Sequence, residues 1–117
     1  MAEVVAFVDD LFFQSKIMET ARHVGVELKF VSTGGALAEV MASAKPRLVI
    51  VDLNARQGPV ESIEQLRAAG NSTPLVAFLS HVQVDLAERA RAAGAQEVMP
   101  RSKFTQNLAT ILAGAKS

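Results

Sequence analysis

Five side chains with chemical potential stand at the ends of apolar runs in the sequence. They are Asp9 and Asp10 after the first run, Asp52 at the end of the third, Ser80 at the end of the fourth and Arg101 after the fifth. Carboxylates gathered within a few ångströms repel one another and need a cation, and oxygen ligands of this kind suit octahedral Mg²⁺. An aspartyl carboxylate beside such a cation can act as a nucleophile for a phosphoryl group, whose remaining oxygens a guanidinium and a hydroxyl would meet.

Short apolar segments rich in β-branched residues precede these side chains. Five of them are candidate strands: residues 4–8, 26–31, 47–53, 74–80 and 96–99. Segments 48–51 and 75–79 are continuously apolar, which is typical of strands that are covered on both faces. We therefore expect these two strands to be central.

Segments with apolar residues three and four positions apart follow each candidate strand. In the first, Phe13, Ile17 and Ala21 share one face, and Gly25 is the expected C-cap. The other candidate helices are residues 36–43, 60–69, 84–93 and 104–115. Five repeats of strand and helix predict an α/β fold, a doubly wound (βα)5 five-stranded parallel sheet with helices on both faces. Ligands of such sheets bind beyond the carboxyl ends of the strands, where the five side chains should meet.

Length and composition exclude several classes of protein. A chain of 117 residues has room for one domain, spanning residues 1–117. The balance of 12 Lys and Arg against 12 Asp and Glu argues against binding nucleic acid or a membrane surface through net charge. The absence of cysteine excludes a disulfide framework, a thiolate metal site and a cysteine nucleophile. With neither a signal-peptide pattern nor a run near the roughly 20 apolar residues of a membrane span, we expect a soluble cytoplasmic domain.

Three segments together resemble the signature stretches of bacterial response-regulator receiver domains. They are residues 5–10 (VAFVDD), 47–54 (RLVIVDLN) and 93–101 (AGAQEVMPR), and the similarity runs along the whole chain. The resemblance implies a flavodoxin-like sheet with strand order 2-1-3-4-5. It also implies that Asp9 and Asp10 are the acidic pair for Mg²⁺ and that Asp52 is the phosphoacceptor. The backbone carbonyl of Asn54 would be a further metal ligand.

The resemblance also implies a function and a kind of partner. A receiver domain accepts its phosphoryl group from a sensor histidine kinase or a phosphotransfer protein in two-component signalling. It is a phosphorylated switch with at most slow autodephosphorylation and not a metabolic enzyme. We expect a monomer or weak homodimer that binds a downstream protein and has no direct contact with nucleic acid or membrane.

Arg101 departs from the family pattern, which has a lysine after the fifth strand. The guanidinium is a wide planar fork and the ammonium is compact, so the exchange is not neutral in a tight phosphoryl pocket. Two interpretations stay open. Arg101 contacts the phosphoryl group, or it is a structural arginine that leans inward and neutralises the acidic cluster in place of a metal.

The switch positions of the family are altered as well. A count from the start of the fourth strand puts Leu79 at the position of the family's Ser/Thr, whereas the chemistry at the strand end favours Ser80, which we choose. The family's aromatic switch position corresponds to Val98, and the loop 55–59 lacks the family's proline and is shorter. If this domain switches, it does so by a modified route.

These departures motivate an alternative function. A pseudo-receiver would use the same fold as a phosphorylation-independent protein-interaction module. A flavodoxin-like cofactor-binding protein or small enzyme is disfavoured, because residues 9–13 (DDLFF) replace the Ser/Thr/Gly phosphate loop after the first strand and no G-x-G-x-x-G stretch exists.

Several of these residues also have purely structural interpretations. Asp9 and Asp10 could simply end a strand and cap the following helix, since Asp is a favoured N-cap, and residues 32–35 (STGG) fit a turn before a helix better than a phosphate cradle. His81 is expected in a solvated loop and His23 on the surface. Phe12, beside Leu11, should lie exposed near the carboxylates, where an apolar patch suits docking of a partner helix.

Overall fold

The computed structural model describes residues 2–80 and 83–116 and alternates strands with helices along the chain. The strands are β1 (Val4–Phe7), β2 (Leu28–Val31), β3 (Leu48–Asp52), β4 (Leu75–Leu79) and β5 (Glu97–Pro100). The helices are α1 (Leu11–Val24), α2 (Gly34–Ala44), α3 (Pro59–Ala68), α4 (Val84–Ala93) and α5 (Arg101–Ala113). All strand pairs are parallel, in the order β2-β1-β3-β4-β5, so the expected fold class and strand order are confirmed.

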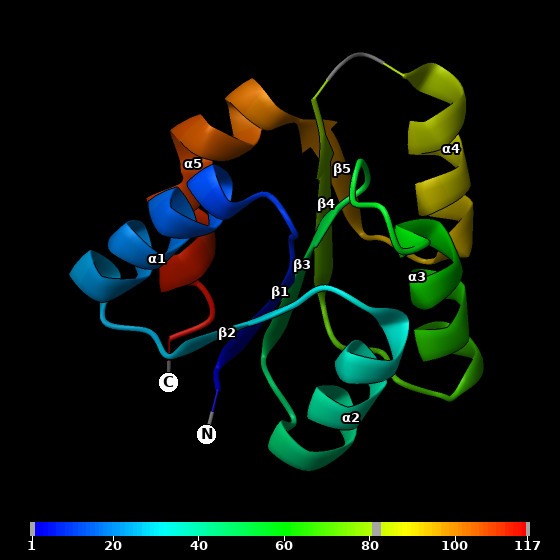
Figure 1. The fold of residues 1–117 in the computed structure, drawn as a ribbon, viewed down its shortest axis with the longest axis horizontal. Helices are drawn as coiled ribbons and strands as arrows, with labels where there is room; N and C mark the ends of the chain where they lie inside the picture. The colour runs from blue at the N-terminus through cyan, green and yellow to red at the C-terminus, as the bar shows by residue number, and fades with distance from the viewer. Residues whose placement is uncertain (1, 81–82, 117) are drawn as a thin grey trace.

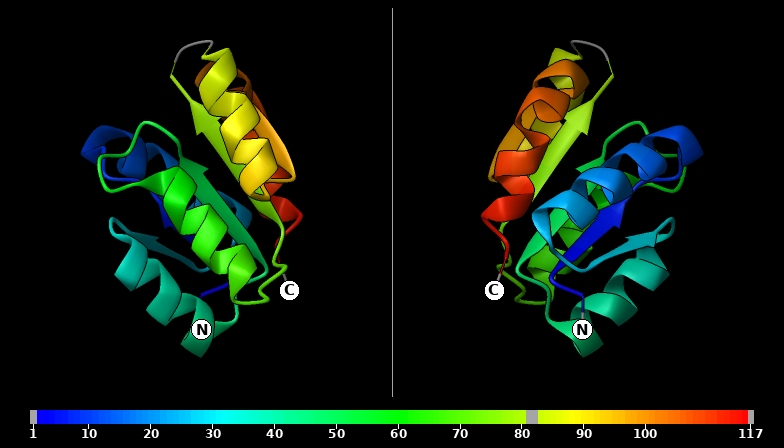
Figure 2. Two further views of the ribbon diagram at one scale, coloured as in Figure 1. Left: turned by 90° about the vertical axis from the view of Figure 1, so that its right-hand side faces the viewer. Right: turned by 90° about the vertical axis from the view of Figure 1, so that its left-hand side faces the viewer.

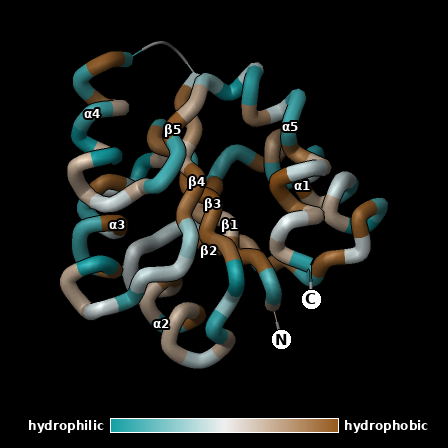
Figure 3. Tube along the Cα trace, turned by 180° about the vertical axis from the view of Figure 1, so that it is seen from behind, coloured by the Kyte–Doolittle hydropathy of each residue, from teal (hydrophilic) through white to brown (hydrophobic). Residues whose placement is uncertain are grey.

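The sheet separates two layers of helices (Figures 1 and 2). Helices α1 and α5 cover one face, and α2, α3 and α4 cover the other. Because successive strand residues point to opposite faces, β3 sends Val49 and Val51 into one core and Leu48 and Ile50 into the other. The inner strands β1, β3 and β4 are accordingly mostly apolar in Figure 3, while the helices alternate between apolar and polar residues. The strands β3 and β4 lie inside the sheet, as their sequences predict.

The ends of several elements differ from the expectation by a few residues. The last helix begins at Arg101 and not at residue 104, because Pro100 holds an extended backbone (φ −61°, ψ 151°) directly before it. The second begins at Gly34, because the side chain of Thr33 accepts a hydrogen bond from the Ala36 N–H and caps the helix. Residues 32–35 are therefore a turn and a helix start. Helix α4 has the expected bounds.

The strand register determines which residues meet at the carboxyl edge of the sheet. Phe7 of β1 lies opposite Val51 of β3, so the residues that follow β1 lie beside Asp52. On its other side, β3 pairs with β4, where Asp52 lies opposite Phe78. Within residues 2–80 and 83–116, the helices are all too short or too polar to cross a membrane.

At the opposite edge of the sheet, Arg67 of α3 fastens the turn that follows α4. Its Nε and one terminal nitrogen donate to the carbonyl oxygen of Gly94 at 3.1 and 3.0 Å, and further donors reach Asn71 O and Gln96 Oε1 at 3.0 Å. Gly94 has a positive φ of 123°. A Cβ atom at this position would lie 2.5 Å from Cγ of Arg67, so the turn has no space for a larger residue.

We expect Gly94→Ala to destabilise the fold more than Gly70→Ala does. Both glycines have positive φ values, and a Cβ at Gly70 would meet nothing within 4 Å, so Gly70→Ala reports the backbone strain alone. That strain costs roughly 1 kcal/mol, and the clash with Arg67 should at least double the loss in Gly94→Ala. Urea unfolding of both variants measures the two free energies. Equal losses would contradict the clash.

Candidate functional site

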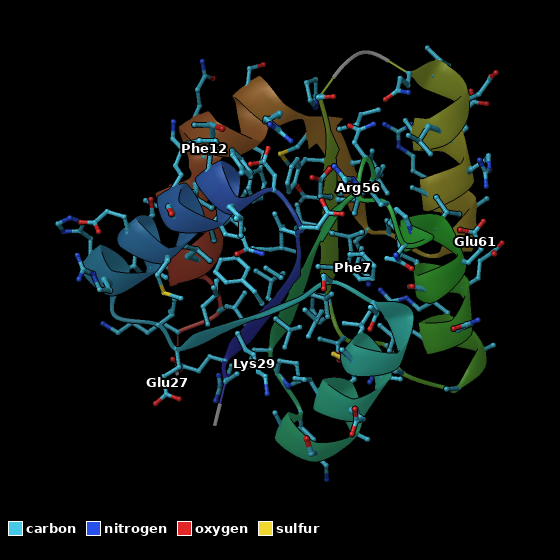
Figure 4. All side chains as sticks on the ribbon, viewed as in Figure 1. Phe7, Phe12, Glu27, Lys29, Arg56 and Glu61 are labelled. Atoms are coloured by element: carbon cyan, nitrogen blue, oxygen red, sulfur yellow. The ribbon has the colours of Figure 1, made fainter. Side chains whose placement is uncertain are left out.

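Residues from three separate segments meet at the carboxyl edge of the sheet. They line one cavity of about 410 Å³ and are Asp9, Asp10, Asp52, Asn54, Arg56 and Arg101. Asp9 and Asp10 lie between β1 and α1, Asp52 ends β3, and Arg101 begins α5. In Figure 4, Arg56 lies on the loop after β3, toward the same end of the molecule as Phe12 at the start of α1. The structure thus gathers three carboxylates and two arginines that are far apart in the sequence.

Asp52 is the most buried charged group of this cavity, with 2% of its surface exposed. One carboxylate oxygen, Oδ1, accepts a hydrogen bond of 2.9 Å from the backbone N–H of Asn54. The other, Oδ2, lies 3.5 Å from a terminal nitrogen of Arg101. Burial raises the pKa of Asp52 above its ordinary value, more than the Asn54 N–H and the Arg101 charge lower it, and the charges of Asp9 and Asp10 raise it further.

Asp9 and Asp10 each already have a donor from the chain. Asp10 is the N-cap of α1, because its Oδ1 accepts from the Phe13 N–H at 3.1 Å, while its Oδ2 lies 3.7 Å from Arg101. Asp9 Oδ2 accepts from the backbone N–H of Arg56 at 3.0 Å. The structural interpretation of Asp10 as a helix cap is therefore correct, and the same carboxylate also faces the cavity.

The residue types of this cavity suit Mg²⁺, whose ligands are carboxylate and carbonyl oxygens. Their arrangement in this structure differs from that of a metal site. Among residues 2–80 and 83–116, no three His, Cys, Asp or Glu side chains are grouped closely enough to hold a metal ion. Two of the carboxylates converge on Arg101 instead. The donor set fits the ion chemically, and in this structure Arg101 lies between two of the carboxylates that would hold it.

Arg101 leans into the acidic cluster, as one of the two interpretations of this residue expects. Its guanidinium carbon lies 4.5 Å from the ring centroid of Phe13 and 5.7 Å from that of Phe78. About 30% of the side chain is exposed, and its Nε atom is buried without a hydrogen-bond partner. The aromatic faces and the carboxylates together hold the positive charge in the cavity.

Ser80 is not among the described residues that line the cavity. Its hydroxyl donates to Oδ1 of Asn54 at 3.0 Å, and its backbone N–H donates to the same oxygen at 2.6 Å. Asn54 therefore holds the Ser80 hydroxyl in this structure, and the role of Ser80 as the switch hydroxyl stays a prediction. Leu79, the other candidate for this position, is buried in the core under α4.

Asn54 joins two loops at this edge of the sheet. Besides its contacts with Ser80, its side-chain nitrogen donates to Oε1 of Gln83 at 3.0 Å, and Gln83 directly precedes α4. Its backbone N–H holds Asp52. A continuous chain of hydrogen bonds therefore runs from the buried carboxylate to the beginning of α4.

Comparisons with known proteins show where else this fold occurs. No protein-family model and no curated protein sequence matches the chain. Solved structures do. The response regulator RPA3017 of R. palustris is 15% identical over 95% of this chain and 91% of its own, with a TM-score of 0.76. The receiver domain of NtrX from Brucella abortus is 19% identical over 96% of each chain, with a TM-score of 0.78.

A LuxR-family DNA-binding response regulator of Staphylococcus aureus is 12% identical over the full length of both chains, with a TM-score of 0.82. The chain has the receiver-domain fold. At these identities the similarity is one of fold alone, and the chemistry of the site depends on the side chains of this chain.

The remaining positions of the receiver pattern differ as the sequence indicates. Val98 packs against the core on the α4 side and has no ring to rotate. His23 is exposed and lies 3.4 Å from Glu19 in the next turn of α1, while His81 lies outside the described residues. Leu11 and Phe12 are exposed by 74% and 92%, as expected of an apolar patch beside the carboxylates.

Sequence reasoning missed three contributors to this site. Arg56 lines the cavity, and its position four residues after Asp52 in a loop at the carboxyl edge was an available signal. The Phe13 and Phe78 rings support Arg101, but both residues also fit the apolar core pattern, which concealed this contact. The bridge from Asn54 to Gln83 depends on two side-chain directions that spacing does not determine.

We expect Asp52→Asn to stabilise the protein at neutral pH. Because the folded state raises the pKa of Asp52 above 3.8, the ionised carboxylate opposes folding, and this cost grows as the pH rises through the folded-state pKa. The variant should gain on the order of 1 kcal/mol at about pH 7.5, and the gain should vanish as the pH falls below the ordinary value of 3.8, where the carboxyl is protonated in both the folded and the unfolded state.

Urea unfolding at several pH values measures this difference. Asp85→Asn is the matched control, because it removes an exposed carboxylate from the first turn of α4 and should not stabilise the protein. A stability gain that did not depend on pH would contradict the assignment to Asp52 ionisation.

Proposed function

We propose that this chain is a receiver module of two-component signalling that accepts a phosphoryl group on Asp52 from a phosphohistidine of a histidine kinase or phosphotransfer protein. The observation that supports this most strongly is the position of Asp52. It is a buried carboxylate at the end of a central strand, in one cavity with Asp9, Asp10 and Arg101, in a chain with the receiver fold.

The two oxygens of Asp52 have different environments, and this assigns their roles. The Asn54 N–H holds Oδ1 and fixes the plane of the carboxylate, whereas Oδ2 faces the charged side of the cavity and is the nucleophile. Oδ2 forms the new bond to phosphorus as the bond from phosphorus to the imidazole nitrogen breaks. The electron pair of that bond stays on the imidazole, which takes a proton from solvent. Arg101 supplies a positive charge beside the phosphoryl oxygens.

Mg²⁺ belongs to this proposal as the ion that the residue types suit. Asp9, Asp10 and Asp52 would hold it together with the backbone carbonyl of Asn54, and it would neutralise the charge of the transferred group. Donors of the chain itself orient the carboxylates that would bind the ion. Asp10 is fixed by its capping bond to α1, and Asp9 by the N–H of Arg56.

The proposed output of phosphorylation is a change around α4. A phosphoryl group on Asp52 adds negative charge beside the loop that Asn54 occupies. Because Asn54 is hydrogen-bonded to both Ser80 and Gln83, a shift of this loop would be transmitted to the start of α4. This route differs from the family's Ser/Thr and aromatic pair, because Asn54 holds the Ser80 hydroxyl and Val98 has no ring. The module is a phosphoacceptor and not a metabolic enzyme.

Incubation with acetyl phosphate and Mg²⁺ should add one phosphoryl group to the full chain. Intact mass spectrometry should detect the product, and hydroxylamine should remove it, because an aspartyl phosphate is an acyl phosphate. Asp52→Asn should abolish the addition, and Asp85→Asn should leave it unchanged. A product that persists in Asp52→Asn would place the phosphoryl group elsewhere and overturn the proposal.

A pseudo-receiver is the second candidate, and the contacts of Arg101 favour it. This residue already supplies the positive charge that Asp52 and Asp10 need, which is the arrangement expected when the site no longer takes a phosphoryl group. The exposed Leu11 and Phe12 would then contribute to a constitutive binding surface. A folded wild-type chain that stays unmodified by acetyl phosphate would support this function.

A further inference from the structure

We propose that Arg101 is the resident cation of this site and that a divalent cation binds only in competition with its guanidinium. The inference rests on the acidic site of the proposed function. On this inference, metal affinity depends on two aromatic rings, Phe13 and Phe78, as well as on the carboxylates.

The first support is the charge balance of the cavity. Asp9, Asp10 and Asp52 contribute three negative charges, and Arg101 lies 3.7 Å from Asp10 and 3.5 Å from Asp52. It thus touches two of the carboxylates that a hard cation would need. Among the described residues, no three His, Cys, Asp or Glu side chains are grouped closely enough to hold a metal ion, and Arg101 lies between two of the carboxylates. A divalent cation would therefore have to take the place of the arginine charge.

The second support is the platform beneath the guanidinium. The Phe13 ring lies 4.5 Å from its central carbon and the Phe78 ring 5.7 Å. These rings are fixed, because Phe78 is stacked on Phe104 at 4.5 Å and Phe13 lies 5.0 Å from Phe78. A cation over such a face gains roughly 0.5–2 kcal/mol, depending on its exposure to water. The rings therefore favour the state in which Arg101 occupies the cavity.

The third support is the length of the contacts. Strong charge-assisted hydrogen bonds span about 2.7–2.9 Å, and the Arg101 pairs at 3.5 and 3.7 Å are longer. The buried Nε has no partner at all. Charge and ring faces hold the guanidinium without a closed set of hydrogen bonds. Arg101 can therefore leave when a more strongly charged ion arrives, which makes the relation competitive and not a permanent block.

Isothermal titration of the full chain with Mg²⁺ tests the competition without any phosphorylation. Arg101→Gln removes the charge and keeps most of the side-chain volume, and it should tighten Mg²⁺ binding about tenfold, as should Arg101→Ala. Phe13→Leu keeps the arginine and weakens its platform, so it should tighten binding by a smaller factor, about two- to fourfold. Adding Asp10→Asn to Arg101→Gln should remove the gain.

Phe30→Leu is the matched control for Phe13→Leu. It removes a ring that packs against the same layer of the core, whereas the ring contacts of Arg101 are with Phe13 and Phe78, which pack on each other and on Phe104. Mg²⁺ affinity should stay at the wild-type value in this variant. Circular dichroism checks that each titrated variant is folded.

The results separate this inference from the proposed function. Equal Mg²⁺ affinity in wild type, Arg101→Gln and Arg101→Ala would overturn the inference, and so would the absence of Mg²⁺ binding from all three folded proteins. Neither result depends on whether acetyl phosphate adds a phosphoryl group to the chain, which is the test of the proposed function. Conversely, a tenfold gain in Arg101→Gln without phosphorylation of Asp52 would sustain the inference and count against the proposed function.

Discussion

The charge of one buried carboxylate determines how the rest of this site is arranged. Asp52 ends a central strand and is almost completely shielded from water, so its negative charge needs partners that the protein itself supplies. The Asn54 N–H and the Arg101 guanidinium are those partners. Burial outweighs both and keeps the pKa of Asp52 raised. The negative charge of Asp52 is thus incompletely compensated, and a further positive charge or a proton would stabilise the site.

The fold delivers this arrangement through the parallel sheet. Because every strand points the same way, the segments that follow β1, β3 and β5 emerge at a common edge. Position there depends on strand register, which the two apolar cores fix from both faces. Helix caps complete the positioning, since the bond from the Phe13 N–H to Asp10 both starts α1 and orients a carboxylate of the cavity.

The fold was largely readable from the sequence, and the site only in part. Continuous apolar runs and helical periodicity predict every element, because burial on both faces of a sheet leaves a strong pattern. The meeting of Asp9, Asp10 and Asp52 follows from topology alone. The orientation of Arg101 does not, since a flexible side chain has several places to go and its aromatic support reads as ordinary core. The partner of the Ser80 hydroxyl could not be predicted, because the Asn54 side chain that accepts from it is a tertiary contact.

The two cores that the sheet separates have a mechanical consequence. Arg101 lies on rings that belong to the α1 and α5 layer, whereas the Asn54 bridge leads to α4 in the opposite layer. Asp52 is therefore linked to both layers of helices by different kinds of contact. Arg101 links it to the stacked rings on one side, and the hydrogen bonds of Asn54 link it to Gln83 on the other. Substitutions among the rings would therefore change the surroundings of Arg101 and leave the hydrogen bonds between Asn54 and the start of α4 in place.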